Sequence, residues 1–312
     1  MALPGLNWLT RQTPSSKTSP AARPTVVGKP VSRAANAGAR GSRGVVNAYD
    51  GVHPDYDLTV GIFPSPKGNY GFLLHERISG ETAIVDPMDA GPIVALARAR
   101  GCGIHHVLNT HYHNCAGNLA LKRATGCKIH GPAAEADRIP GIDIAYKGGE
   151  TFTLGKLTGE VLAVPGHTFG HLAFWMPGAG VLFCGDVLTP MGCGRLVEGT
   201  AHEMWRSLDI IRNLPPETLI YSGFECAQAN GRFALTIDRK NMWLQSRMKR
   251  VDQACGAGRA SVPVKLEDEH TTNPFLRVDD DRIAAAVGLQ GAGAVDVFTE
   301  LRKRRDLFQL QA

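Results

Sequence analysis

The strongest constraint on the fold of this chain is a series of short apolar runs that alternate with helical patterns. Runs such as "IHHVLNT", "VLFCGDVL" and "TLIYSGFE" have the length and composition of buried strands. Between them, "GPIVALARARG", "NLALKRATG" and "TAHEMWRSLDIIRNLPP" have the apolar spacing of amphipathic helices. This alternation predicts an α/β domain at residues 51–225.

Strand patterns stop after residue 226. We expect "GRFALTIDRKNMWLQSRMKRVDQACGAG" to form one long amphipathic helix and "AVDVFTELRKRRDLFQL" to form a shorter closing helix. Helices without intervening strands predict a second, helical domain at residues 226–312.

The first 50 residues differ from the rest in charge. Residues 1–49 hold seven Lys or Arg and no acid, which leaves 27 basic and 29 acidic residues in the rest of the chain. A basic, Ser-rich and acid-free segment is typical of an organelle transit peptide, and the alternatives are a flexible tail or an arm on RNA phosphates. The seven cysteines include no CxxC pair, which favours reduced thiols, and no apolar run reaches the roughly 18–20 residues of a membrane span.

Four loop segments that follow apolar runs carry the residues with metal-binding chemistry. They are "THYHN" at 110–114, "VPGHTFGH" at 164–171, "FCGDVLTPMGCGR" at 183–195 and "YSGFE" at 221–225. If these strand ends are neighbours, three imidazoles and one carboxylate converge from His111, His113, His167 and Asp186. Three histidines and a carboxylate are a ligand set that zinc prefers.

Five segments in order, "VLNTHYH", "PGHTFGH", "GDVLTPMGCGRLVEGT", "TTNPFLRV" and "ELRKRRDLF", follow the pattern of a known family. The chain resembles glyoxalase II, the hydroxyacylglutathione hydrolase branch of the metallo-β-lactamase fold, over roughly residues 55–312. The resemblance implies an α/β fold, an αββα sandwich followed by a helical C-terminal domain of the glyoxalase II type.

The resemblance implies two metal sites, of which this sequence retains one. The family motif Thr-His-x-His-x-Asp-His is matched only through His113, and the Asp and the third His are missing before Gly117. The histidine of the family's "GHE" segment is Phe224 here. We therefore expect one zinc ion and no second metal, because the matches to the first metal's ligands all survive: His111, His113, His167 and Asp186.

The shortened motif leaves two questions open. Aligned from its right end alone, it assigns Asn109, His111, His113 and Asn114 to the ligand places and disrupts both sites, although the left end matches over more residues. A zinc ion closed by Asp186 as its fourth ligand would be structural, whereas a site that water can enter would allow slow one-metal hydrolysis.

The resemblance also implies a glutathione pocket that is half retained. Arg195, Arg302 and Arg305 match its basic positions, and guanidinium groups suit the carboxylates of a tripeptide. Two family tyrosines correspond to Val197 and Cys226. The alternative for residues 302–305 is a solvated basic helix face or a contact for RNA or an acidic neighbour.

Other candidate residues are expected to have supporting roles. We expect His171 to hold the site together rather than bind metal. No general base is evident beside the cysteines, so we expect Cys115, Cys184 and Cys193 to be packing residues rather than nucleophiles.

Loss of the second metal site, the basic arm and the Arg-rich C-terminus together predict a pseudoenzyme. We expect a structural subunit of a large mitochondrial protein or ribonucleoprotein assembly in the matrix, such as the mitoribosome or a respiratory complex. The alternatives are a hydroxyacylglutathione thioester hydrolase with a single metal, or a module that binds glutathione-like conjugates. Another organelle or the cytoplasm is the alternative location.

Overall fold

The computed structural model describes residues 57–65 and 68–311, so the arm predicted at residues 1–50 lies outside the described residues. The strands are β1 (Leu58–Pro64), β2 (Tyr70–Glu76), β3 (Thr82–Val85), β4 (His106–Leu108), β5 (Lys128–Pro132), β6 (Ile144–Tyr146), β7 (Thr151–Leu154), β8 (Leu157–Ala163), β9 (Leu172–Met176), β10 (Val181–Gly185), β11 (Leu188–Thr189), β12 (Gly192–Cys193), β13 (Leu219–Ser222) and β14 (Val264–Lys265).

The helices are α1 (Ala90–Ala99), α2 (Asn118–Thr125), α3 (Ala201–Arg212), α4 (Ala227–Ile237), α5 (Met242–Gly256), α6 (Leu266–Thr272), α7 (Asp281–Ala286) and α8 (Ala294–Gln311). Short 3-10 turns are η1 (Tyr112–Asn114), η2 (Ala133–Arg138), η3 (Pro177–Ala179) and η4 (Pro274–Leu276). Among the described residues, no helix has the combination of length and apolarity needed to cross a membrane.

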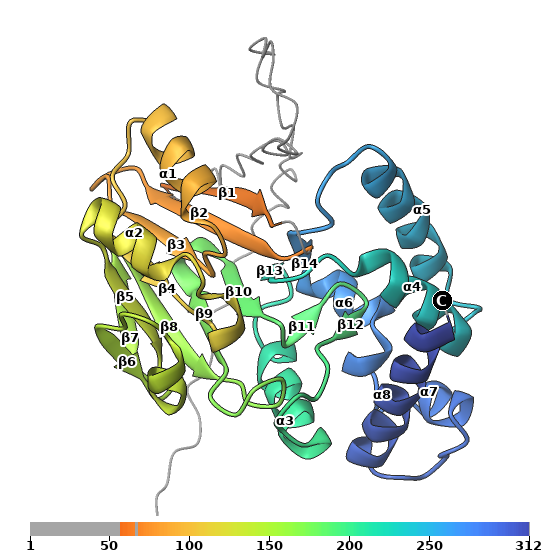
Figure 1. Ribbon diagram of the computed structural model, residues 1–312. Coiled ribbons are helices and arrows are strands. Elements are labelled where there is room, and N and C mark those ends of the chain that lie inside the picture. Colours follow the sequence, from red (N-terminus) through yellow and green to blue (C-terminus); the bar gives the residue numbers. More distant parts are fainter. Residues whose placement is uncertain (1–56, 66–67, 312) are drawn as a thin grey trace, which may run out of the picture. The chain divides into compact units, whose positions relative to one another are not determined.

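The strands form two six-stranded sheets and a small ribbon (Figure 1). The first sheet has the order β1-β2-β3-β4-β5-β6, and the second has the order β14-β13-β10-β9-β8-β7. Strands β3 to β6 run parallel to one another, as do β10 and β13. Loops that follow β4 and β10 therefore leave the carboxyl ends of strands in the two facing sheets.

Within single strands, alternate side chains are buried on opposite faces of the sheet. In β2, Phe72 and Leu74 pack between the sheets, whereas Leu73 packs with residues of α1 and α2. In β10, Phe183 packs between the sheets and Leu182 packs with α3 on the other face. Successive strand side chains point to opposite faces, so both faces of each sheet are covered. The two sheets pack against each other and helices cover their outer faces, which gives four layers. The αββα sandwich expected from the resemblance is confirmed.

The helices of the sandwich begin and end at residues with a clear local reason. Gly126 ends α2 in the left-handed conformation, with φ of 74°, and its N–H donates to the Lys122 carbonyl. Thr200 begins α3 with a capping box, because its hydroxyl accepts from the Glu203 N–H and the Glu203 carboxylate accepts from the Thr200 N–H.

Three expectations for the C-terminal part were wrong. The predicted long helix is broken into α4 and α5, because the Asn241 side chain accepts from the Leu244 N–H and begins a new helix there. The closing helix α8, with 18 residues, is longer than either piece. Strands also do not stop at residue 226, since β14 pairs antiparallel with β13. A two-residue strand is too short to give a periodic signal.

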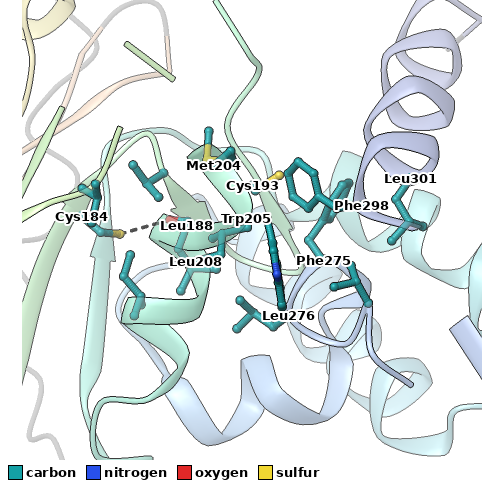
Figure 2. Close-up of a cluster of buried hydrophobic side chains, with 14 of the residues drawn as sticks. Cys184, Leu188, Cys193, Met204, Trp205, Leu208, Phe275, Leu276, Phe298 and Leu301 are labelled. Atoms are coloured by element: carbon teal, nitrogen blue, oxygen red, sulfur yellow. Dashed lines mark hydrogen bonds between the residues drawn. The ribbon is translucent and has the colours of Figure 1, made fainter. Parts of the chain in front are cut away.

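The C-terminal helices share a continuous core with the second sheet. Figure 2 shows Trp205 and Leu208 of α3 beside Cys184, Leu188 and Cys193, with side chains from η4 and α8 completing the cluster. The predicted boundary between residues 225 and 226 therefore crosses a packed interface. The division into domains at that point stays a prediction.

A buried ion pair anchors the β11–β12 ribbon to the helices. Glu269 of α6 is fully buried, pairs with Arg247 of α5, and accepts hydrogen bonds from the Met191 N–H and from Asn273 Nδ2. Met191 lies between the two ribbon strands in the left-handed region, with φ of 56°. Glu269 thus fixes a strained turn next to Gly192 and Cys193.

Candidate metal centre

Three predicted ligands come together at the carboxyl ends of the strands. His111 follows β4, His113 lies in η1, and His167 follows β8. One ring nitrogen from each lies within 4.8 Å of the others, and these three are the potential metal-binding group found in the described part of the chain. Asp186, directly after β10, has its Oδ2 3.5 Å from His167 Nε2 and 3.9 Å from His111 Nε2.

A hydrogen-bond chain fixes the orientation of His111. The buried Asp86 carboxylate accepts from the Thr110 hydroxyl at 2.7 Å, and the Thr110 backbone N–H donates to the same carboxylate at 2.8 Å. Because the Thr110 hydroxyl hydrogen is used in this way, its oxygen accepts from His111 Nδ1 at 2.9 Å. His111 Nε2 then carries a lone pair and faces the other ligands.

His167 is oriented by the backbone. Its Nδ1 donates to the Arg195 carbonyl at 2.8 Å, so its Nε2 carries the lone pair. That Nε2 lies 3.1 Å from His113 Nδ1. The nitrogen atoms that converge are therefore Nε2 of His111, Nδ1 of His113 and Nε2 of His167.

Two polar atoms of this cluster are buried without a hydrogen bond to any described residue. His111 Nε2 and Asp186 Oδ1 are buried and have no hydrogen-bond partner among the described residues. Burial lowers the pKa of His111 well below its usual value and that of His113 to about 4, with neighbouring histidines adding to the effect. Neutral imidazole is the form that binds metal, and three imidazoles with a carboxylate suit zinc. The cluster fits a zinc ion.

On the side of Asp186 away from the histidines, the neighbouring side chains are not metal ligands. Asn114, which ends the shortened motif, and Phe224, which stands where the family has a histidine, line the cavity there. Neither an amide nitrogen nor a phenyl ring is a metal ligand. Asn109, which the alternative alignment placed among the ligands, instead accepts from Asn118 Nδ2 at 2.7 Å and donates to the Asn114 carbonyl at 3.4 Å. This geometry favours the alignment from the left end of the motif.

One cavity of about 590 Å³ joins the histidine cluster to the predicted basic residues. His113, His167 and Asp186 line one part of it. Its lining also includes Arg195, Arg302 and Arg305. Residues from the sandwich and from α8 thus form a single site, although more than 100 positions separate Cys193 from its hydrogen-bond partner Arg302.

The α8 arginines are inside the protein rather than on a solvated face. Arg302 and Arg305 are only 4% and 5% exposed, so the alternative of a solvated helix face was wrong for them. Arg302 donates to the Cys193 carbonyl at 3.0 Å, and Arg305 donates to Asn230 Oδ1 at 3.0 Å. Arg302 Nε and Arg305 Nη1 are buried without partners, so each guanidinium has a donor available. The Arg195 side chain is exposed at the cavity.

The remaining candidates have supporting positions. His171 Nε2 accepts from the Asp186 N–H at 3.2 Å, and its ring stacks on His111 with centroids 4.6 Å apart. Cys115, Cys184 and Cys193 are buried. Burial raises the pKa of each thiol, to about 12 for Cys184. A protonated thiol is a poor nucleophile, in agreement with the expected packing role.

Sequence reasoning missed residues that hold the ligands. Asp86 was seen only as the end of a strand before Pro87, although a carboxylate at the end of a buried strand was an available signal. Asn230 gave no signal, because its partner Arg305 is distant in sequence. Asn114 entered only as a ligand place of the alternative alignment, and its contact with Asn69 was not foreseen.

Two family models match this chain in succession. The model described as the metallo-beta-lactamase superfamily matches residues 68–223, and the model described as the hydroxyacylglutathione hydrolase C-terminus matches residues 225–308. Among solved structures, the crystal structure of ETHE1 from Myxococcus xanthus is similar with a TM-score of 0.55 and 19% identity, covering 80% of this chain and 99% of that one. At this identity, the likeness shows the fold alone.

Similar sequences are hydroxyacylglutathione hydrolases from bacteria. The protein of that name from Methylococcus capsulatus is 50% identical over 79% of this chain and 97% of its own length. The one from Cereibacter sphaeroides is 46% identical over 78% of this chain and 97% of its own length.

These relatives correct several expectations. The predicted pseudoenzyme and structural subunit were wrong, because proteins this similar are named as hydrolases. The predicted mitochondrial matrix location and mitochondrial or ribonucleoprotein assembly were also wrong, since the relatives are bacterial and bear the name of an enzyme. The error was to infer loss of activity from a shortened motif, whereas relatives of this similarity are named as hydrolases.

The family models and the relatives agree with the order of motifs and with the observed architecture. The sandwich is followed by the helical segment in this chain as in the models, and the relatives match along nearly their whole length. The chain belongs to the hydroxyacylglutathione hydrolase family.

Proposed function

We propose that this protein hydrolyses acyl thioesters of glutathione, with one zinc ion bound by His111, His113, His167 and Asp186. The observation that carries the proposal is the single cavity, which brings a cluster of unpaired metal-binding atoms together with buried, partly unpaired arginines. The names of the relatives support the substrate class.

The chain's own residues divide the work between ligand binding and orientation. A zinc ion at such a site lowers the pKa of water and polarises a carbonyl group. Thr110 and the Arg195 carbonyl hold His111 and His167 in the tautomers that present Nε2. The buried sheet ends keep these rings from rotating, so the ligands are in place before the ion binds.

Arg195, Arg302 and Arg305 would bind the carboxylates of glutathione. Arg302 and Arg305 lie deep in the cavity wall, where an unpaired guanidinium N–H gains most from an anionic partner. Arg195, exposed at the cavity, would contact a carboxylate closer to solvent. The two tyrosines that the family resemblance implies are Val197 and Cys226, so binding would depend more strongly on these cations.

We propose one ion rather than two. The Asn114 amide and the Phe224 ring line the space beyond Asp186. The amide oxygen already accepts from Asn69 Nδ2, and the amide nitrogen and the phenyl ring are not ligands that a divalent cation prefers. We also propose that residues 51–225 form the metal-binding domain and that residues 226–312 form a helical domain that supplies Arg302 and Arg305. The two family matches, which meet near residue 224, support this division.

The test is metal content together with turnover of S-D-lactoylglutathione by the purified chain. We expect about one zinc per chain, thioester loss at rates above the uncatalysed reaction, and loss of both zinc and turnover in His111→Ala. An exposed histidine outside the cluster supplies the matched control, His202→Ala, which should leave both unchanged. A folded, zinc-loaded protein without thioester turnover would contradict the proposal.

A further inference from the structure

The cavity contains a buried amide that the residue roles above do not use. Asn114 is 1% exposed, lies at the end of η1 and lines the cavity with Asp186. Its Nδ2 has no hydrogen-bond partner among the described residues. Buried amide donors in proteins are nearly always paired, so this one has a donor available for a group that enters the cavity.

Neighbouring residues fix the direction in which this amide points. Asn114 Oδ1 accepts from Asn69 Nδ2 at 3.0 Å. Asn69 is itself held by an antiparallel bridge to Phe224. The oxygen is thus fixed on the Asn69 side, and the nitrogen faces the side that holds the carboxylates of Asp86 and Asp186. A nitrogen in that position is favoured over an oxygen by electrostatics.

The space before the amide nitrogen is shared with Asp186. A Cβ built on Gly223 would lie 2.8 Å from Asp186 Oδ1 and 3.5 Å from Asn114 Nδ2, so both atoms border the space that this glycine leaves open. Burial raises the pKa of Asp86 to about 7, while hydrogen bonds from Thr110 and the polar Asn114 amide nearby lower it. Asn114 Nδ2 is near that carboxylate but has no hydrogen-bond partner among the described residues.

Thioester hydrolysis needs a hydrogen-bond donor or a cation at the carbonyl oxygen. The water oxygen forms a bond to the carbonyl carbon while the C=O π pair moves onto the carbonyl oxygen. That pair then returns as the C–S bond breaks, and the sulfur leaves as a thiolate. One proton of the water goes to the thiolate and the other to solvent, which gives a carboxylate and a thiol. Negative charge develops on the carbonyl oxygen, and a fixed N–H donor stabilises it.

We propose that Asn114 is a catalytic residue whose Nδ2 donates to the thioester carbonyl oxygen as its charge develops, in the region where the described residues supply no histidine for a second cation. The inference rests on the proposed thioester hydrolysis. It assigns a role to the shortened loop, because η1 ends at Asn114 and presents a neutral donor beside Asp186.

The test compares Asn114→Ala, which removes the donor, with Asn114→Asp, which keeps the shape and replaces the donor by an acceptor. For each zinc-loaded protein, kcat and KM are measured with S-D-lactoylglutathione, and metal content and the melting temperature are recorded. Binding of an S-alkyl thioether of glutathione, which has no carbonyl oxygen, reports on ground-state binding alone. Asn213→Ala is the control, because its amide donates to the Asp209 carbonyl and does not line the cavity.

Loss of one such donor typically lowers kcat by about 100- to 1000-fold. We expect this loss in both Asn114 variants, with one zinc retained and thioether binding within about twofold of the unmodified chain. A kcat within about threefold in Asn114→Ala overturns the inference and leaves the proposed function intact. Joint loss of zinc, thioether binding and melting temperature overturns it too, because the amide is then structural. Binding of a second zinc with faster turnover in Asn114→Asp also overturns the inference, because catalysis then does not need the amide donor. Absence of turnover in the unmodified chain overturns both proposals.

Discussion

Replacing Thr110 with valine should weaken zinc binding without unfolding the protein. Thr110 is fully buried, and its hydroxyl joins the Asp86 carboxylate at 2.7 Å to His111 Nδ1 at 2.9 Å. Valine keeps the branched shape but removes both hydrogen bonds. The Thr110 backbone N–H still donates to Asp86 in the variant, because this bond at 2.8 Å does not involve the side chain.

The expected loss of zinc affinity follows from the two polar groups that lose their hydrogen-bond partner in Thr110→Val. A buried polar group that loses its partner costs about 1–3 kcal/mol, and here a carboxylate oxygen and an imidazole N–H are both affected. Removing a hydrogen bond that orients a metal ligand weakens metal binding about 10- to 100-fold. That range corresponds to about 1.4–2.7 kcal/mol. We therefore expect the zinc dissociation constant of Thr110→Val to rise by one to two orders of magnitude.

The assay is competition for zinc with a chromophoric chelator at neutral pH, with urea unfolding of the metal-free protein measured in parallel. Thr110→Ser retains the hydroxyl and is the matched control, with zinc affinity expected within about threefold of the unmodified chain. A folded Thr110→Val protein that binds zinc as tightly as Thr110→Ser would refute the role assigned to this hydrogen-bond chain.

Arg305→Ala should raise KM for a glutathione thioester by about 10- to 150-fold in steady-state kinetics, because a charge-assisted hydrogen bond contributes about 1.5–3 kcal/mol. The control Arg304→Ala should change KM little, since Arg304 pairs with a carboxylate of its own helix. Glu269→Gln should lower the free energy of unfolding, measured in urea, by about 3–5 kcal/mol, because it leaves a buried guanidinium of α5 without its carboxylate. Glu267→Gln, at an exposed ion pair, should lower it by less than about 1 kcal/mol. Equal losses in the two variants would contradict the role assigned to the buried pair. Burial by itself would raise the pKa of Glu76, but hydrogen bonds from the Ser79 side chain and from backbone N–H groups outweigh it and lower this pKa to about 2. Since the folded pKa lies below the unfolded value of about 4.3, this stabilisation is present at neutral pH and is lost as pH falls from about 4.3 to about 2, so the melting temperature of Glu76→Gln should depend less on pH over that window than that of the unmodified chain.

Local patterns were sufficient for most of the sandwich. Capping by Thr200 and the left-handed Gly126 are properties of neighbouring residues, so the ends of α3 and α2 could be read from the sequence. The same local logic failed at Asn241, where a capping side chain inside an amphipathic pattern divides one expected helix into two. It failed again at β14, whose two residues pair with a strand more than 40 positions away.

The sequence by itself determined the order of motifs, the fold family and the candidate ligands His111, His113, His167 and Asp186. Residue identity and spacing along the chain are enough for those inferences. Only the tertiary structure decided which nitrogen of each ring faces the centre, since this depends on partners such as Thr110 and the Arg195 carbonyl. It also decided that Arg302 and Arg305 of α8 are buried in the same cavity as the ligands. Hydrogen bonding and burial arise between segments that are distant in sequence, and no local pattern records them.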